Sequence, residues 1–327
     1  MLSSKIVIIG AGSASFGPTT LATIIRDERL RGCELALVDL NEHSLATVAS
    51  VTQKMSDAWG ADMNIRASTD RRDVLANADF VIVSIEVPPR EELWRLDWEI
   101  PLKHGLRQPY AENGGPGGLM HACRQIPPFM EIVKDMEALC PDAWLINFSN
   151  PLPRITRAVT KYSAIKTVGK CHQIEVGYGI AAVLLRDRYG IEVPDGISLR
   201  SDPGNTAVIH TLGAAGRKHI NIKSAGLNHF IWLADVRDKE TGEDLYPALV
   251  SGLGVNGVHI GELPPAVTEL LRREAALVEM VVDTAVTGDR SLALQTLLLD
   301  PMINDITRAR AILDDYLTTF DSYLPQF

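Results

Sequence analysis

The chain has 327 residues, enough for two domains and a large hydrophobic core. A hydrophobic content of 46% and a charged content of 22% are ordinary for a soluble globular protein. The net charge of −9 argues against nucleic-acid binding, and no apolar run is long enough to span a bilayer. The chain opens on a strand pattern without a leader peptide, and its four cysteines show no paired spacing, so we expect a cytoplasmic protein without disulfides.

Strand and helix patterns alternate over residues 1 to about 170. Apolar runs predict strands at 5–10, 34–39, 62–66, 79–84, 143–147 and 165–169. Apolar residues at helical spacing predict helices at 17–29, 41–59, 90–103, 118–139 and 152–162. This alternation predicts an α/β fold, a Rossmann-type doubly wound parallel sheet with helices on both faces.

The first predicted strand ends in a glycine turn, KIVIIGAGSASF over residues 5–16. Gly10 allows a sharp turn and Gly12 lets a phosphate approach the backbone, while Ser15 stands where a third glycine usually packs the helix on the strand. Asp39 ends the second strand, where a carboxylate accepts hydrogen bonds from an adenosine ribose and repels a 2′-phosphate, so we expect NAD rather than NADP. The alternative is a unit without a nucleotide, in which Asp39 only caps the next helix.

Two further segments come after the strand at 79–84 in the chain, one directly and one beyond the helix at 90–103. Ser84 ends the strand at 79–84, close to the expected cofactor cleft, and Pro88 and Pro89 precede a helix that begins at Arg90. The stretch ENGGPGG at 112–118 is too rich in glycine for a helix or strand and predicts a loop. This loop is either a flexible connector or a backbone segment that approaches a ligand, with the helix from 118 directing its positive end at that ligand.

Asn147 and Asn150 follow the strand at 143–147, in the turn NFSNP. Each side-chain amide offers both a donor and an acceptor, which suits a polyhydroxylated ligand. Asn150 also precedes Pro151, as an N-cap does at the start of a helix. Both roles are compatible, with one asparagine capping the helix and the other binding the substrate.

The pattern changes after about residue 192. Strands are predicted in succession at 197–200, 207–212, 219–224 and 229–236, which indicates an antiparallel sheet. Helices are predicted at 263–280, 291–298 and 303–320. We therefore expect an NAD-binding domain at 1–192 and a second, α+β domain at 193–327 that contributes to substrate binding, metal binding and subunit contacts.

Cysteine and histidine residues mark one more candidate site. Cys171 and His172 follow the last parallel strand, and His229 lies between a turn and an apolar strand. A Cys/His pair leaves open positions on a metal, as a catalytic site requires, but each residue alone is more often structural. The sequence leaves both interpretations open.

Six motifs occur together in this order: GAGSxxF, VDL, GGPGG, NFSNP, GKCH and GLNHF. In this respect the chain resembles the family-4 glycoside hydrolases over most of residues 4–250 and again over about 256–318. The resemblance implies an architecture like that of lactate and malate dehydrogenases, with NAD and Mn²⁺ as cofactors. It also implies a redox-assisted elimination: oxidation of the sugar at C3, metal-assisted removal of the C2 proton, loss of the aglycone, addition of water and return of the hydride.

The resemblance also assigns residues. Cys171 and His229 match the metal ligands, and His172 stands where members with 6-phosphate substrates carry Asp or Asn. This implies a non-phosphorylated glycoside, acidic glycosides included, with His172 as the acid toward the leaving oxygen. We place at the cofactor site Gly10, Gly12, Ser13, Phe16, Asp39 and Ser84, and at the substrate site Asn147, Asn150 and Arg90.

One departure from the family concerns the base. A long family segment that contains the tyrosine usually assigned as the C2 base is replaced here by residues 251–257. Either the gene has lost the segment or a mobile stretch is absent from the sequence. Tyr110, Tyr178 and Tyr246 remain as candidates, but none lies on a matching motif.

Two alternatives to a glycosidase follow. The first is an NAD-dependent dehydrogenase for a sugar or a 2-hydroxy acid, although a simple dehydrogenase of 2-hydroxy acids has no role for the Cys171/His229 pair. The second is a non-catalytic protein that binds NAD or a sugar and lacks the base segment. The family habit suggests a homodimer or a homotetramer.

Overall fold

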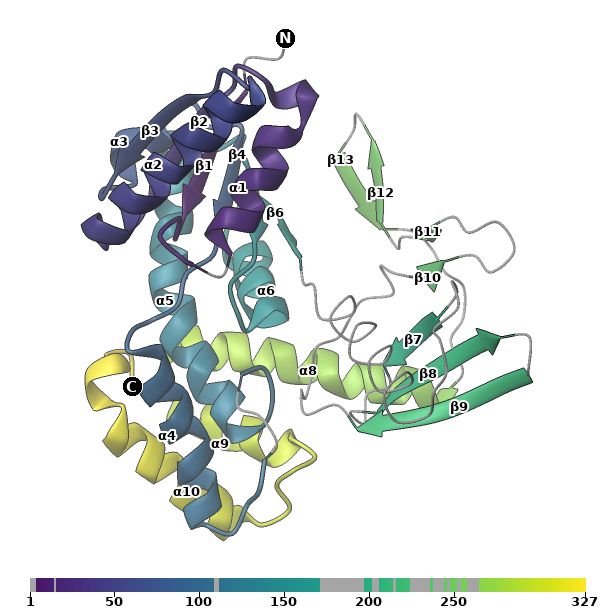
Figure 1. Ribbon diagram of the computed structural model, residues 1–327. Coiled ribbons are helices and arrows are strands. Elements are labelled where there is room, and N and C mark those ends of the chain that lie inside the picture. The colour runs from purple at the N-terminus through teal and green to yellow at the C-terminus, as the bar shows by residue number, and fades with distance from the viewer. Residues whose placement is uncertain are drawn as a thin grey trace.

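The computed structural model describes residues 4–14, 16–108, 112–170 and 265–327, together with short strands between residues 197 and 257. Figure 1 shows the described elements: a sheet with its helices, a long helix α8 that crosses below it, and a separate group of strands, β7 to β13.

Six parallel strands form the main sheet, in the order β3-β2-β1-β4-β5-β6. They are β1 (Lys5–Ile9), β2 (Glu34–Val38), β3 (Asn64–Ser68), β4 (Phe80–Val83), β5 (Trp144–Asn147) and β6 (Lys166–Gly169). The strand order reverses between β1 and β4, which is where ligands bind in sheets of this type. The predicted Rossmann-type sheet is confirmed, with strand boundaries within two residues of those expected.

Helices cover both faces of this sheet. They are α1 (Gly17–Arg26), α2 (Glu42–Trp59), α3 (Arg72–Leu75), α4 (Arg90–Lys103), α5 (Gly115–Leu139) and α6 (Leu152–Tyr162). Alternate residues of β1 face opposite ways: Ile6 and Ile8 join the core with α1 and α2, while Val7 and Ile9 join the core with α5 and α6. This alternation is why the strand is a continuous apolar run. α1 ends three residues before the expected position, because the 3₁₀ turn η1 (Glu28–Leu30) follows it.

The start of α5 corrects one prediction. The expected loop at 112–118 extends only to residue 114, and Gly115 already begins the helix. Pro116 lies in the first helical turn, where a missing N–H costs nothing, and Gly115 adopts φ +66°, which favours glycine. The segment is buried from Asn113 onward, so the interpretation as a flexible connector is wrong.

The second half of the chain contains antiparallel pairs, as expected. β7 (Ile197–Ser201), β8 (Thr206–Gly213) and β9 (Gly216–Lys223) form one sheet. Two hairpin-like pairs follow: β10 (Val236–Arg237) with β11 (Asp244–Leu245), and β12 (Ala248–Ser251) with β13 (Gly254–Gly257). The expected strand at 229–236 falls outside the described residues except for its last residue.

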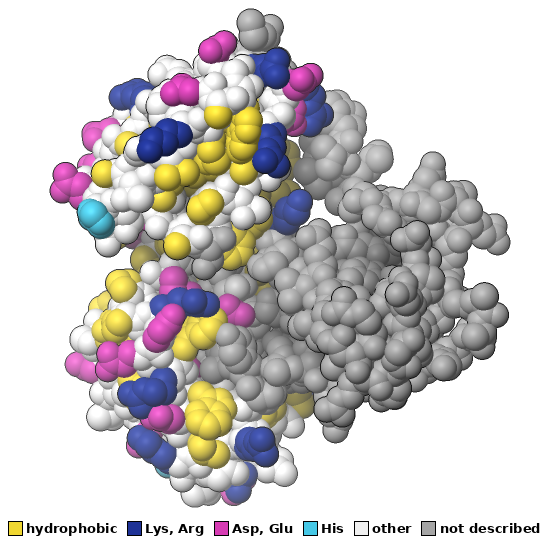
Figure 2. Space-filling view, in the orientation of Figure 1, with side chains coloured by type: hydrophobic (Ala, Val, Ile, Leu, Met, Phe, Trp, Pro, Cys, Tyr) yellow, Lys and Arg dark blue, Asp and Glu magenta, His cyan; other side chains and the backbone are white. Residues whose placement is uncertain are grey.

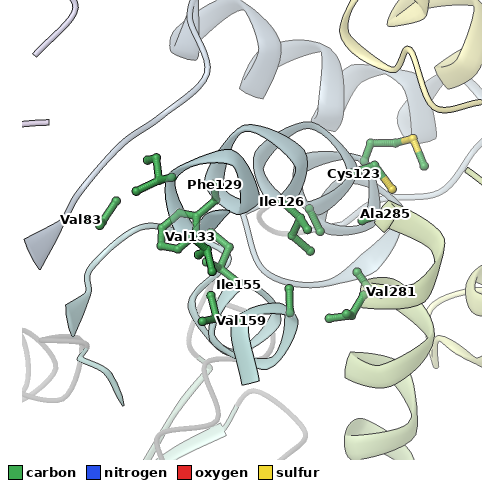
Figure 3. Close-up of a cluster of buried hydrophobic side chains, with 14 of the residues drawn as sticks. Val83, Cys123, Ile126, Phe129, Val133, Ile155, Val159, Val281 and Ala285 are labelled. Atoms are coloured by element: carbon green, nitrogen blue, oxygen red, sulfur yellow. The ribbon is translucent and has the colours of Figure 1, made fainter. Parts of the chain in front are cut away.

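The C-terminal helices share the core of the main sheet. They are α8 (Pro265–Thr287), α9 (Arg290–Leu299) and α10 (Ile306–Thr319), followed by η2 (Asp321–Tyr323). Figure 3 shows Val281 and Ala285 of α8 beside Cys123 and Ile126 of α5, with Ile155 of α6 in the same cluster. The core is therefore continuous between these helices and the sheet, while the predicted boundary at 192–193 lies outside the described residues and stays a prediction.

The surface, the helix lengths and the cysteines can be reported for the described residues. In Figure 2 basic and acidic side chains of the described residues are interspersed on the visible face. Within the described residues, no helix has the length and apolar character needed to cross a bilayer. The side chains of Cys33, Cys123 and Cys140 are buried, and Cys171 lies outside the described part.

A buried ion pair joins α4 to α5. Arg124 donates two hydrogen bonds to Asp97, at 2.8 and 2.5 Å, and the side chains are 1% and 0% exposed. The guanidinium also stacks on Phe320, 4.3 Å from the ring centroid, and Tyr316 donates to the Asp97 carbonyl at 2.6 Å. Arg124 is thus a packing residue between α4, α5 and the chain's last helices.

Removing one partner of this pair tests its role. We expect Arg124→Ala to lower the free energy of unfolding by about 3–5 kcal/mol, because Asp97 is left buried and unpaired. The matched control is Arg95→Ala, which removes an exposed pair with Glu99 on the same helix α4 and costs about 1 kcal/mol or less. Urea denaturation of both variants makes the comparison; equal costs would contradict the assignment.

Candidate functional site

The glycine turn brings β1 into close contact with β4. Gly10 and Ala11 both donate to the Val38 carbonyl, at 2.9 and 3.0 Å, so the chain turns directly over the end of β2. Gly10 has φ +87°, and a Cβ atom there would lie 1.9 Å from the carbonyl oxygen of Ser84. Only glycine fits this position, and Ser84 is placed by the same contact.

A third glycine does pack the first helix, at a different position from the one considered in the sequence. A Cβ on Gly17 would lie 2.7 Å from the Ala11 carbonyl oxygen. Gly17 is the first residue of α1, so the close approach lies between the helix start and the turn. The missing glycine at Ser15 is thus compensated two residues later, a shift that the motif spacing alone did not reveal.

Asp39 lies against the glycine turn. Its Oδ2 accepts from the Gly12 N–H at 2.8 Å and its Oδ1 accepts from the Asn41 N–H at 2.9 Å. The cap of α2 itself is Asn41, whose side chain accepts from Ser44. Asp39 is therefore not the cap of α2, and its carboxylate is held at the carboxyl ends of β1 and β2.

Ser13 and Phe16 continue this turn. The Ser13 hydroxyl accepts from the Phe16 N–H at 3.3 Å, and the Ser13 carbonyl accepts from Gly17 at 2.9 Å. The Phe16 ring meets Phe148 edge-on, with centroids 6.0 Å apart. This contact joins the glycine turn to the turn after β5, so the two predicted site segments are neighbours.

The two asparagines after β5 have different surroundings. Asn147 is fully buried: its Oδ1 accepts from Ser149 at 2.7 Å and its amide donates to Thr156 at 3.3 Å. Asn150 is half-buried, and its Oδ1 accepts from the Leu152 N–H at 3.3 Å while its amide points to Glu112. Asn147 thus shapes the turn, and Asn150 combines a contact at the helix start with one at the candidate site.

Glu112 is a site residue that the sequence reasoning did not assign. Its Oε1 accepts from the Asn150 amide at 2.8 Å. Burial raises the pKa of the Glu112 carboxyl, although the charge of His121 and the Asn150 bond oppose this. The signal available in the sequence was its place at the head of ENGGPGG, a segment with one interpretation as backbone that approaches a ligand.

The main chain of Glu112 contacts a buried polar group formed by His121, Glu86 and Gln125. His121 is fully buried, with Nδ1 2.8 Å from the Glu112 carbonyl oxygen and Nε2 3.0 Å from Oε1 of Glu86. The amide of Gln125 donates to the same Glu86 oxygen. Arg90, predicted at the substrate site, has an exposed side chain that stacks over Trp94 at 4.0 Å.

The start of α5 is held from inside the protein. The Gly115 N–H donates to Asp300 at 3.1 Å and the Gly117 N–H donates to Gln108 at 3.2 Å. Burial raises the pKa of Asp300, while hydrogen bonds from the main chain and the charge of Arg154 oppose the rise. Internal side chains thus satisfy two N–H groups of the helix start that the sequence had suggested for a ligand.

The chain is similar to proteins of one known family in both of its halves. Residues 5–186 match the family described as family 4 glycosyl hydrolase, and residues 246–303 match its C-terminal domain. The chain belongs to family 4 of the glycosyl hydrolases. The resemblance drawn from the six motifs is therefore confirmed.

Curated relatives of this family 4 protein include an alpha-glucosidase of Erwinia rhapontici, 39% identical over 246 residues, which cover 75% of this chain and 48% of that protein. An alpha-galactosidase of Bacillus subtilis (strain 168) is 34% identical over 247 residues, covering 75% of this chain and 50% of the relative. The chain spans about half the length of these two relatives.

A third relative aligns almost end to end. It is named probable 6-phospho-beta-glucosidase, from Bacillus subtilis (strain 168), and is 27% identical. The alignment covers 99% of this chain and 98% of that protein. The alignment has 434 positions and the chain has 327 residues, so at least 107 positions stand opposite no residue here. Internal sequence of the relative is therefore missing from this chain.

Solved structures show the same fold. A 6-phospho-alpha-glucosidase from gut microorganisms, in complex with NAD and glucose-6-phosphate, has a TM-score of 0.72 at 17% identity and covers 99% of both chains. A 6-phospho-beta glucosidase of Thermotoga maritima with manganese, NAD⁺ and glucose-6-phosphate has a TM-score of 0.71 at 17% identity, with coverage of 98% and 99%. A lactate dehydrogenase of Cryptosporidium parvum reaches 0.53 at 13% identity, covering 88% of this chain and 99% of that one, which confirms the dehydrogenase-like architecture.

The structure does not test the predicted metal site and acid. Cys171, His172 and His229 are outside the described residues, so their assignments stay predictions. Within the described part of this family 4 protein, no group of three or more His, Cys, Asp and Glu side chains could hold a metal ion.

The glycine turn yields a prediction with an internal control. Gly10→Ala adds a Cβ that collides with the Ser84 carbonyl, so we expect a loss of about 3 kcal/mol or more in the free energy of unfolding. Gly32→Ala has the same kind of positive φ, +76°, but nothing within 4 Å, and is expected to cost only about 1–2 kcal/mol. Urea denaturation compares them; an equal loss would show that backbone strain alone selects glycine at residue 10.

Proposed function

We propose that this family 4 protein is an NAD- and Mn²⁺-dependent glycosidase that acts on a non-phosphorylated glycoside. The match to the family in both halves of the chain carries the proposal. The alpha-glucosidase and alpha-galactosidase relatives support a neutral sugar, and an acidic one is kept open by an alpha-galacturonidase relative, 29% identical over 231 residues. His172, in place of the Asp or Asn of 6-phosphate enzymes, supports the non-phosphorylated class.

The described residues fit a dinucleotide. The Gly10 and Gly12 positions have no room for a side chain, because a Cβ on Gly12 would lie 2.8 Å from Asp39. In the proposal the backbone of this turn binds the pyrophosphate, and the Asp39 carboxylate beside it accepts hydrogen bonds from hydroxyl groups of the adenosine ribose. When bound, NAD supplies a reversible acceptor for the hydride of a sugar carbon.

On the sugar side, this chain supplies polar groups near the dinucleotide turn. Asn150 and Glu112 are already hydrogen-bonded to each other, and Arg90 is exposed on the first turn of α4. In the proposal these groups bind sugar hydroxyls, His172 donates a proton to the leaving oxygen, and Cys171 and His229 hold Mn²⁺. When bound, the metal supplies Lewis acidity at the sugar oxygens.

One observation favours a second function. At least 107 aligned positions of the end-to-end relative are missing here, and the tyrosine assigned as base by the resemblance has no counterpart on a matching motif. Without a base, the chain is a sugar dehydrogenase that binds NAD and oxidises the sugar without cleaving it. A nitrophenyl α-glycoside assay with NAD⁺ and Mn²⁺ separates the two: the glycosidase releases nitrophenol without net NADH, and the dehydrogenase accumulates NADH.

The same proposal includes the oligomeric state of the enzyme, its cellular compartment and its partners. It acts as a homodimer or homotetramer on a small glycoside, in the cytoplasm, without a nucleic-acid or membrane partner. Sedimentation equilibrium measures the assembly, and a monomer at micromolar concentration would contradict it.

Asp39 provides a test of cofactor binding. We expect Asp39→Ala to weaken NAD⁺ binding roughly 10- to 100-fold, since hydrogen bonds to a charged group contribute about 1.5–3 kcal/mol. The control is Asp57→Ala, which removes an exposed acidic side chain near the end of α2. Calorimetric titration measures both variants, and unchanged affinity in the first would contradict the cofactor assignment.

Cys171 provides a test of metal binding. We expect Cys171→Ser to raise the Mn²⁺ concentration for half-maximal binding by at least about tenfold, because a thiolate ligand is lost. The control is Cys140→Ser. Cys140 follows α5 and precedes β5, so it lies near the amino ends of the parallel strands, away from the carboxyl ends that carry the candidate site. Equilibrium dialysis with metal analysis measures binding directly, so Mn²⁺ affinity equal to that of the unmodified protein refutes the ligand assignment.

A further inference from the structure

His121 is a buried histidine whose two ring nitrogens both face acceptors. Nδ1 lies 2.8 Å from the main-chain carbonyl oxygen of Glu112, and Nε2 lies 3.0 Å from the carboxyl oxygen Oε1 of Glu86. The side chain is 0% exposed, whereas that of Glu86 is 24% exposed. Neither residue has a role in the proposed function above.

The number of protons follows from these contacts. A carbonyl oxygen only accepts, so Nδ1 must carry a hydrogen. A neutral imidazole has no second N–H, and its Nε2 lone pair would then face the Glu86 oxygen. The contact is attractive only if one more proton lies between Nε2 and that oxygen, so the pair holds a proton that a neutral histidine and a free carboxylate together do not have.

Charged neighbours favour this proton. Burial by itself lowers the pKa of His121, but the hydrogen bond and charge of Glu86 outweigh it, and the charge of Asp97 adds to them, so the pKa is raised. The groups that face the ring are Glu86 after β4, Asp97 and Trp94 on α4, and Glu112 before α5. Although Arg124 pairs with Asp97, the contact with Glu86 is the strongest influence that raises the pKa of His121.

The pair contacts both parts of the candidate sugar site. Through Nδ1 it holds the main chain of Glu112, whose carboxyl group meets Asn150. Through its ring it packs edge-on against Trp94, with centroids 6.1 Å apart, and Trp94 in turn carries the stacked guanidinium of Arg90. Glu112 and Arg90 lie on different segments, and His121 is the buried residue that they share.

We propose that Glu86 and His121 share one proton and act as a positioning pair that holds Glu112 and, through Trp94, Arg90 in their places at the sugar site. Loss of the proton leaves a lone pair facing a carboxylate, and the repulsion loosens both supports. The positioning role rests on the proposed function, whereas the shared proton does not.

Glu86→Gln separates hydrogen bonding from charge. Both His121 and Gln125 contact the same Glu86 oxygen, Oε1. In this variant an amide nitrogen at that place can donate one hydrogen to Nε2 of a neutral His121 and the other to the Gln125 side-chain oxygen, once the Gln125 amide turns over. Both contacts can then be hydrogen bonds while the shared proton is removed. The control is Glu92→Gln, the same change at an exposed position on α4.

The first measurement is NMR of the imidazole ¹⁵N nuclei against pH, with His121→Asn used to assign the signal among eight histidines. We expect His121 to be protonated at pH 7 in the unmodified protein and neutral, with hydrogen on Nδ1, in Glu86→Gln. A neutral His121 at pH 7 in the unmodified protein overturns the proposal, whether or not the protein is a glycosidase.

Stability provides a second readout. A histidine whose pKa is raised on folding contributes stability that is complete below the unfolded value, about 6.5, and is lost as pH rises through the folded value. As the pH rises above about 6.5, the melting temperature of the unmodified protein should therefore fall by more than that of Glu86→Gln. Identical pH dependence in the two proteins overturns the shared proton.

The third measurement is the pH profile of kcat/KM. We expect the alkaline limb to move in Glu86→Gln, with activity at pH 7 within about tenfold of the unmodified protein, and to stay in place in Glu92→Gln. An unmoved limb with a protonated His121 refutes the positioning role. Absence of glycosidase activity in the unmodified protein refutes the proposed function, and the NMR result still decides the shared proton.

Discussion

The structure depends on the close approach of β1 and β4 at Gly10. Only a residue without a side chain can pass the Ser84 carbonyl there, and this is where the strand order reverses. The contact brings the glycine turn, Asp39 and the end of β4 to one edge of the sheet, and the Phe16–Phe148 contact adds the turn after β5. The candidate dinucleotide site and the candidate sugar site therefore share one set of strand ends.

Much of this could be predicted from the sequence, because the signals are local. The six strands are short apolar runs, and the helix starts carry the proline or asparagine that helices prefer. Two features were not predicted, because one is too short to show a periodic pattern and the other depends on a contact that residue spacing does not reveal. α3 has four residues, too few for a helical period, and Gly17 replaces the expected third glycine through a contact with Ala11 that spacing does not report.

The site was only partly predictable for the same reason. Asp39 and Asn150 were found because each follows a strand at a characteristic position. Glu112 and His121 were not assigned, since what defines them is a set of contacts among β4, α4, α5 and the turn after β5, which come together only in the fold. Arg124 and His121 are three residues apart on one helix, yet Arg124 joins two helices through a buried ion pair, whereas His121 contacts Glu86 and Glu112.

The missing family sequence does not remove these supports. The start of α5 is held by Gln108 and by Asp300, which follows α9, and α8 packs into the core beside α5. These groups lie either before residue 171 or after residue 264, on both sides of the segment that is replaced at 251–257. A chain that lacks this segment therefore keeps the described dinucleotide turn, Glu112 and His121 in position. Under the proposed function, the missing sequence bears on the base of the elimination, and so on which reaction would follow once the sugar and NAD are bound.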